Sequence, residues 1–216
     1  MKGLLINNYY AVRSSAKAFS IFMLLLGAFV TIIVSQSLLL FYMLLSIIGF
    51  FINAISSIGK DYISKWGKYK LTTPVKRSDI VKSHFLSQVV WLLVGMIFAG
   101  IAMGVFWFLH GCPFDRSIDI LIMFSTGISI SLFAGAIFFP LFYVTGEEKN
   151  GAFLAISLLC AIGIVVGITT IINIVFGPEM TTWQITFGVI IMFACSLLSF
   201  VLSYPLTVAI FKRRGY

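Results

Sequence analysis

The chain has 216 residues, of which 60% are hydrophobic and only 10% are charged, whereas soluble domains average about 25% charged residues. So few charges exclude a soluble fold, because its surface would consist largely of apolar side chains. The formal net charge of +8 does not indicate nucleic-acid binding, because the basic residues form short clusters that flank long apolar runs, as is typical of multi-pass membrane proteins.

The N-terminal segment, residues 1–17, is mildly basic, and its apolar side chains recur at helical spacing. We expect a short amphipathic helix on the membrane surface there. Residues 18–59 carry no charge, and the run is long enough for two spans, since one span needs about 20 apolar residues. The polar Ser35-Gln36-Ser37 is the expected hairpin tip between spans at 18–34 and 38–58.

A polar stretch, residues 60–84, follows the second span and holds seven of the fifteen Lys and Arg residues. Within it, Tyr62, Trp66 and Tyr69 fall on one face of a predicted helix. Pro74 ends that helix, because the residue before a proline avoids helical backbone angles. The stretch forms either an elbow that projects from the membrane or a surface helix that rests on lipid headgroups, and the residues alone favour neither interpretation.

The rest of the chain predicts four more spans. Ser78 is the expected N-cap of the helix that leads into the third span, with Asp79 in its first turn. Pro140 and Pro205 lie within spans, where each frees a backbone carbonyl and predicts a kink. Spans three to six are expected at residues 85–109, 118–145, 152–176 and 183–211, so that residues 1–216 form a single all-α transmembrane domain with six spans.

The positive charges predict the orientation of these spans. Six spans place both termini on one side, and fourteen of the fifteen Lys and Arg residues fall on that side. Only Arg116 falls on the other side. The positive-inside rule then places both termini and the stretch 60–84 in the cytoplasm. Trp107 and Trp183 fall at the outer ends of spans three and six, where an aromatic belt is expected.

The middle of each predicted span lacks Asp, Glu, Lys, Arg and His. Ion-coupled carriers usually need such a group within the membrane. His84 and His110 lie at span ends, so no Ser-His pair is available at mid-depth. Neither a phosphate-binding loop nor a zinc-binding motif occurs. We therefore expect no catalytic residues and no metal site in this chain, and any uphill transport would draw its energy from a separate protein.

Small residues are spaced for close helix packing in three spans. Two of the patterns are GxxxG motifs, and the third aligns small residues on one face of span four. We expect these residues to pack within the chain, and a seam between two subunits is the alternative. They are Gly100 and Gly104, Gly127, Ser131 and Gly135, and Gly163 and Gly167.

Two motifs resemble those of type 2 ABC exporter permeases. The first, in the stretch after span two, is Lys65-Trp66-x-Lys68-Tyr69-x-x-x-x-Pro74-Val75-x-Arg77-x-Asp79-Ile80-Val81. The second, at the end of span four, is Pro140-Leu141-Phe142-Tyr143-x-x-Gly146-x-Glu148-Lys149. Together they are similar to the short six-span subfamily of Gram-positive bacteria that includes the phenol-soluble-modulin exporter permeases. One departure is His84-Phe85, where the resemblance leads us to expect a basic residue.

The resemblance implies a permease that works as a dimer with two nucleotide-binding subunits. It implies that ATP and Mg²⁺ bind those subunits and that this chain holds no cofactor. It also implies a cytoplasmic coupling helix within residues 60–84 and a second, smaller contact after span four. The implied coupling residues are Trp66, Tyr69, Pro74, Val75, Arg77 and Ile80, and then Gly146, Glu147, Glu148 and Lys149.

The expected function is therefore ATP-driven export of amphipathic peptides or lipophilic compounds across the bacterial plasma membrane. The uncharged spans favour such a cargo, because a charged group would meet no counter-charge on its way. Two alternatives stay open: a small-molecule-binding membrane subunit of an importer, and a bacteriocin-immunity membrane protein. The mate in the dimer could be an identical chain or a paralogue, and membrane lipid is the remaining expected partner.

Overall fold

The structure is a computed structural model that describes residues 2–33, 35–63, 76–111, 114, 118–145, 150–177 and 180–213. Within these ranges the chain is helical and forms six helices that are long and apolar enough to cross a membrane. The predicted all-α, six-span fold is thus confirmed. The helices are α1 (Lys2–Ile33), α2 (Gln36–Ile63), α4 (Arg77–His110), α5 (Ile118–Thr145), α6 (Asn150–Phe176) and α7 (Thr182–Arg213).

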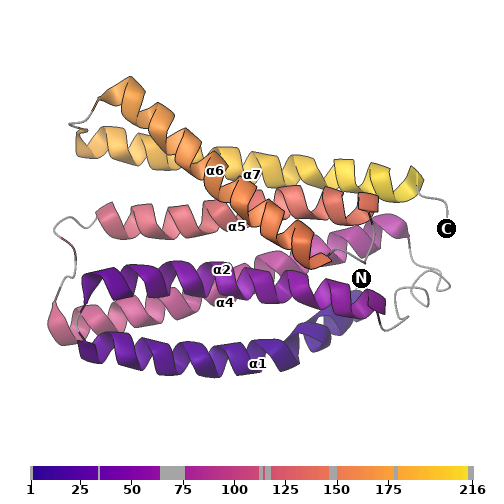
Figure 1. Ribbon diagram of the computed structural model, residues 1–216, viewed down its shortest axis with the longest axis horizontal. Helices are drawn as coiled ribbons and strands as arrows, with labels where there is room; N and C mark the ends of the chain where they lie inside the picture. Colours follow the sequence, from indigo (N-terminus) through magenta and orange to yellow (C-terminus); the bar gives the residue numbers. More distant parts are fainter. Residues whose placement is uncertain are drawn as a thin grey trace.

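The helices form a bundle with two parts. In Figure 1, α1, α2 and α4 lie together in one part, and α5 and α7 lie side by side in the other, with α6 crossing them obliquely. Contacts of α2 with α5 and of α4 with α7 join the parts. The N-terminus and the C-terminus lie toward the same end of the bundle in Figure 1, as an even number of antiparallel spans requires.

The N-terminal segment differs from the prediction. It is not a separate surface helix, because α1 runs without interruption from Lys2 to Ile33 and therefore includes the first span. No Pro or Gly occurs between residues 4 and 26 to end the helix. A helix of 32 residues is about 48 Å long and exceeds the roughly 30 Å of a bilayer's hydrocarbon core. Figure 1 shows α1 curving in the part nearest the N-terminus.

The start of α4 also differs from the prediction. The N-cap is Lys76, which has extended backbone angles and makes no side-chain capping bond, so the expected cap at Ser78 is wrong. The backbone N–H groups of Asp79 and Ile80 already donate to the Lys76 carbonyl, which makes Ser78 an ordinary helical residue. Asp79 does lie in the first turn, where its charge favours the helix dipole.

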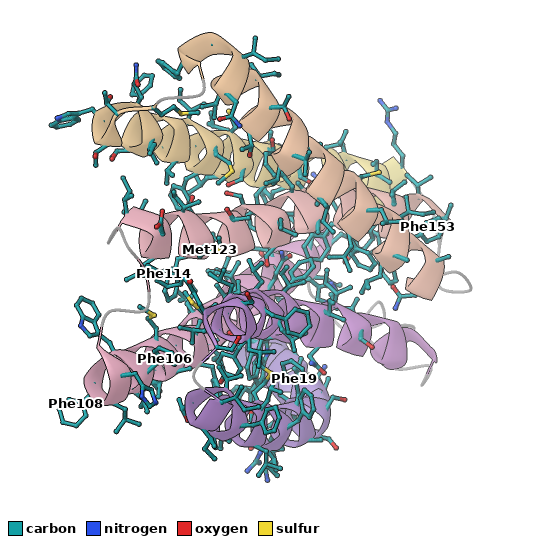
Figure 2. All side chains as sticks on the ribbon, turned by 60° about the vertical axis from the view of Figure 1, so that its left-hand side comes forward. Phe19, Phe106, Phe108, Phe114, Met123 and Phe153 are labelled. Atoms are coloured by element: carbon teal, nitrogen blue, oxygen red, sulfur yellow. The ribbon has the colours of Figure 1, made fainter. Side chains whose placement is uncertain are left out.

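Aromatic side chains fill the contacts between helices. Phe85 of α4 stacks on Phe139 of α5 with ring centroids 4.2 Å apart, and Phe200 of α7 lies 4.9 Å from it. Within the part formed by α1, α2 and α4, Phe19 meets Phe50 edge to face at 5.0 Å, and Figure 2 shows Phe19 between α1 and α2. Such ring pairs add roughly 0.5–1.5 kcal/mol each beyond the burial of their area.

The outer surface of the bundle is apolar. Large hydrophobic side chains are exposed along α1, α4, α6 and α7, and Phe108, which is 90% exposed, projects outward from the end of α4 in Figure 2. A surface of this kind suits lipid as the solvent. Trp107 and Trp183 are also exposed, near the end of α4 and the start of α7, at the end of the bundle opposite the two termini.

Pro140 lies inside α5 and leaves the carbonyl of Ala136 without its usual helical donor. The hydroxyl of Ser203 in α7 donates to that carbonyl at 2.7 Å. The carbonyl that the proline leaves unpaired in one helix thereby accepts a hydrogen bond from a side chain of the neighbouring helix. Membrane proteins need such partners, because lipid cannot hydrogen-bond a backbone group. The proline thus creates a specific link between α5 and α7.

Candidate functional site

The described basic side chains gather toward the end of the bundle that carries both termini, which we call the basic end. They are Arg13, Lys17, Lys76, Arg77, Lys82, Lys212 and Arg213. Of the acidic side chains that the structure describes, Asp79 lies in the first turn of α4 at this end, and Asp119 lies in the first turn of α5 at the opposite end. The charge asymmetry expected from the sequence is therefore present among the described residues.

Two of the predicted coupling residues lie at the start of α4. The Arg77 guanidinium donates to the carbonyl of Phe211 in α7 at 3.2 Å and lies 5.6 Å above the ring of the same residue. Ile80 is 3% exposed and packs in the core. Within the predicted coupling stretch 60–84, Arg77 is therefore anchored to the end of the last helix, and Ile80 is anchored in the core.

The other predicted coupling residues lie outside the described residues, so the geometry of the two predicted contacts with an ATPase stays a prediction. They are Trp66, Tyr69, Pro74, Val75, Gly146, Glu147, Glu148 and Lys149.

Just beyond its start, α4 carries buried polar side chains that bond to other helices. Asn8 of α1 donates to the Ser83 hydroxyl at 3.1 Å. The next residue, His84, is 2% exposed. A hydrogen bond of 2.9 Å joins its Nδ1 to the hydroxyl of Tyr143 in α5. Tyr143 in turn packs on the ring of Phe211 at 4.9 Å. The first turns of α4 therefore connect mechanically to α1, α5 and α7.

These contacts account for the departure from the resembled subfamily at His84-Phe85. Both side chains are buried, and Phe85 packs between Phe139 and Phe200. A Lys or Arg side chain in place of Phe85 would lose this ring packing and place a charge in an apolar core, which is costly.

The small-residue face of α5 meets other helices. A Cβ added at Gly127 would lie 3.0 Å from the Ile47 side chain of α2. One added at Gly135 would overlap the side-chain amide of Gln88 in α4, whose nitrogen donates to the Ser131 carbonyl at 3.3 Å. The notch at Gly135 thus holds a buried amide that links α4 to α5.

The two GxxxG motifs behave differently. A Cβ added at Gly100 or Gly104 of α4, or at Gly163 or Gly167 of α6, would meet no atom within 4 Å. Packing within the chain, which the sequence favoured for these motifs, therefore does not occur among the described residues. The rotation of α4 and α6 turns both glycine pairs toward the outside of the bundle.

A cavity of about 340 Å³ lies between α5, α6 and α7. Its wall is mainly apolar, with Met180 and Met192 among its side chains, and three polar groups enter it, from Thr126, Thr169 and Asn173. These residues lie in the halves of their helices nearest the end opposite the basic end. The cavity suits an uncharged molecule with a large apolar surface and a few hydrogen-bonding groups.

Sequence reasoning did not find this cavity. Its lining comes from three helices and has no linear spacing that a motif could express. The available signal is a side-chain amide, Asn173, inside an otherwise apolar span. Such a residue marks a site only when the neighbouring helices are known.

Residues 3–212 match the family model described as ABC-2 family transporter protein. Searches of curated proteins and of solved structures found no match. The matched range includes the six described helices almost completely, together with both predicted coupling segments.

Proposed function

Because this chain belongs to the ABC-2 family of transporter proteins, we propose that it is the permease of an ATP-driven exporter for amphipathic peptides or lipophilic compounds. Six apolar spans and this family make it a multi-pass membrane protein, in bacteria one of the plasma membrane. Permeases of the family work with ATP-binding subunits. We propose that this chain binds such a subunit through residues 60–84 and dimerises with an identical chain or a paralogue.

The observation that carries the coupling proposal is the attachment of the start of α4. Arg77 bonds to the end of α7, and His84, two turns later, bonds to α5. A displacement of the preceding loop by an ATPase would be transmitted through these contacts from α4, in one part of the bundle, to α5 and α7 in the other. ATP and Mg²⁺ would stay on the partner, and this chain would contribute only the moving helices.

The charge distribution supports the proposed orientation. With the basic end in the cytoplasm, the bundle obeys the positive-inside rule and presents residues 60–84 to a cytoplasmic ATPase. Trp107 and Trp183 then lie at the outer membrane–water boundary, where exposed tryptophans are favoured. The proposed smaller contact, residues 146–149, follows in sequence the end of α5.

The cavity between α5, α6 and α7 supports the proposed cargo class. Thr126, Thr169 and Asn173 offer hydrogen bonds but no charge. An amphipathic helix or a lipophilic compound could present its apolar face to Met180 and Met192, whose flexible side chains adapt to different shapes. With the basic end inside, this cavity lies on the outer half of the permease, where an exported molecule would leave it.

The experiment is reconstitution of the chain with the ATP-binding subunit encoded beside its gene, in liposomes that contain a fluorescent amphipathic peptide. We expect ATP-dependent movement of the peptide. Trp66→Ala with Pro74→Ala should lower transport on the order of tenfold, while the partner still hydrolyses ATP. The matched control, Trp183→Ala with Pro178→Ala, removes the same residue types from the opposite end and should transport normally.

Two outcomes would contradict the proposal. Unchanged transport by the Trp66/Pro74 variant would show that residues 60–84 do not carry the coupling. A chain that never retains an ATP-binding subunit during purification would instead favour an immunity protein, or, if it binds a small molecule tightly alone, the capture subunit of an importer.

A further inference from the structure

A second cavity, of about 400 Å³, lies between the first half of α1 and α4. Six of its lining residues belong to α1 and one, Trp91, belongs to α4. We call it the Arg13–Trp91 groove. Its residues are Tyr9, Arg13, Ala16, Lys17, Ser20, Ile21 and Trp91.

One wall of the groove carries two exposed cations. Arg13 and Lys17 are four residues apart, so their side chains lie on the same face of α1. The described carboxylates, Asp79 and Asp119, form no ion pair with them. The Arg13 guanidinium lies over the ring of Tyr10, with its Cζ atom 5.7 Å from the ring centroid. Two neighbouring cations without a described counter-charge favour an anion between them.

The floor of the groove is a rigid aromatic surface. The indole of Trp91 lies between two nearly parallel rings, that of Tyr9 at 6.0 Å and that of Phe50 at 6.2 Å. Because Trp91 is largely buried in this stack, its position is fixed by packing and does not depend on a ligand. The groove therefore presents the preformed apolar edge of this stack, with Ile21 near it, beside the two cations.

The polarity of the groove changes along α1. Arg13 and Lys17 lie toward the basic end, and beyond Lys17 the helix carries no further charge up to Ile33. The next large side chains that are exposed, Ile21, Phe22, Leu24 and Leu25, are all apolar. A ligand that fits a cationic surface followed by an apolar one has an anionic head at the membrane–water boundary and a hydrocarbon tail that runs toward mid-membrane.

We propose that the Arg13–Trp91 groove binds an anionic glycerophospholipid from the leaflet at the basic end. The phosphodiester lies between the Arg13 guanidinium and the Lys17 ammonium, which suit phosphate oxygens. An acyl chain lies against Trp91 and Ile21. Basic pockets between helices at a membrane surface are suited to such headgroups. The lipid bridges α1 and α4 and is distinct from any exported cargo.

The test uses the fluorescence of Trp91 in the full-length chain. Trp66, Trp107 and Trp183 are replaced by Phe, and phospholipid with brominated acyl chains is titrated into phosphatidylcholine mixed micelles as the quencher. Brominated phosphatidylglycerol should half-quench Trp91 at a mole fraction about thirtyfold lower than brominated phosphatidylcholine, since each cation near an anionic surface contributes about fivefold in affinity.

Variants separate the groove from the general charge of the protein. Arg13→Gln with Lys17→Gln should abolish the preference for phosphatidylglycerol, and Arg13→Lys with Lys17→Arg should retain most of it. The matched control, Lys212→Gln with Arg213→Gln, loses the same charges at the same end and should keep the preference. Size-exclusion profiles and circular dichroism show whether each variant is folded.

The proposal is overturned if the two brominated lipids quench wild-type Trp91 equally, a comparison that needs no groove variant. It is also overturned if the preference survives in Arg13→Gln/Lys17→Gln or is lost equally in Lys212→Gln/Arg213→Gln. Displacement of the lipid by millimolar glycerol 3-phosphate would assign the groove to a soluble phosphate compound, against the lipid. No displacement is expected, because the soluble compound lacks the acyl chains.

Discussion

At the scale of residues, α2 and α4 meet main chain to main chain at Gly95. A Cβ added there would lie 2.9 Å from the Cα of Ile47 and 2.9 Å from the carbonyl oxygen of Ser46. The Ser46 hydroxyl also donates to the Gly95 carbonyl at 3.0 Å. Backbone atoms cannot move aside as a flexible side chain can, so only glycine allows this approach without separating the helices.

We therefore predict that Gly95→Ala lowers the free energy of unfolding by about 1–3 kcal/mol, the usual cost of overpacking. Gly100→Ala, on the same helix, should be neutral or stabilising by up to about 1 kcal/mol, because the added methyl meets open space and alanine favours a helix. Thermal unfolding in detergent, followed by size exclusion, measures both. Equal losses of unfolding free energy in the two variants would show that Gly95 is not needed for the close approach of α2 and α4.

Gly95 also shows what the sequence could predict at this scale. The spacing of Gly100 and Gly104 marks a face that can pack closely, whereas Gly95 is part of no GxxxG motif, although Ala99 follows it at the same spacing. Spacing does not say which face of α4 turns toward α2, because the rotation of a helix depends on all of its contacts. For α5 the spacing predicted a face that packs within the chain, and Gly127 and Gly135 do face neighbouring helices.

At the scale of elements, the link between Pro140 and Ser203 ties α5 to α7. Ser203→Ala would leave the Ala136 carbonyl without a donor. We expect this change to cost about 0.5–1.5 kcal/mol, as for other hydrogen bonds between membrane helices. In a Pro140→Ala background the cost should be smaller, because residue 140 then supplies a backbone N–H to the same carbonyl.

A double-mutant cycle of these two substitutions, measured by reversible unfolding in mixed micelles, gives the coupling energy directly. Ser196→Ala is the control, because its hydroxyl bonds within its own helix and should show no coupling to Pro140. Additive effects of Ser203→Ala and Pro140→Ala would mean that the hydroxyl does not replace the missing donor.

The helices themselves were largely predictable from the sequence, because apolar runs bounded by charges set the number and approximate ends of the spans. Two boundaries were wrong for physical reasons. The change from charged to uncharged residues after Lys17 alters the solvent of α1 but does not break its hydrogen bonds. The N-cap was placed at Ser78 from side-chain preference, whereas the extended backbone occurs at Lys76.

At the scale of the whole molecule, the distribution of charge predicts an orientation that can be tested. In a background with Cys112, Cys160 and Cys195 replaced by Ala, single cysteines are introduced at Leu109 and Lys212, which are exposed near opposite ends. A membrane-impermeant maleimide should label Leu109→Cys in intact cells and Lys212→Cys only after permeabilisation. The reverse pattern would contradict the placement of both termini in the cytoplasm.

The candidate sites were predictable only in part. The motifs after spans two and four pointed to the family, and the match over residues 3–212 confirms a type 2 ABC permease. Neither cavity was predicted, because each combines residues from helices far apart in the sequence. Arg13 and Lys17 were noted only as charges, since their relation to Trp91 depends on how α1 packs against α4.

The shallow attachment of α6 has a consequence for where the bundle opens. Its buried side chains are Ser157, Ala161 and Val165, a single narrow line, and its span has the smallest buried share of the six, 17%. Elements with so few buried contacts have the lowest local free energy of opening. Thermal motion should therefore swing this helix outward about that line before it disturbs any other, which would give the neighbouring cavity a sideways exit into lipid.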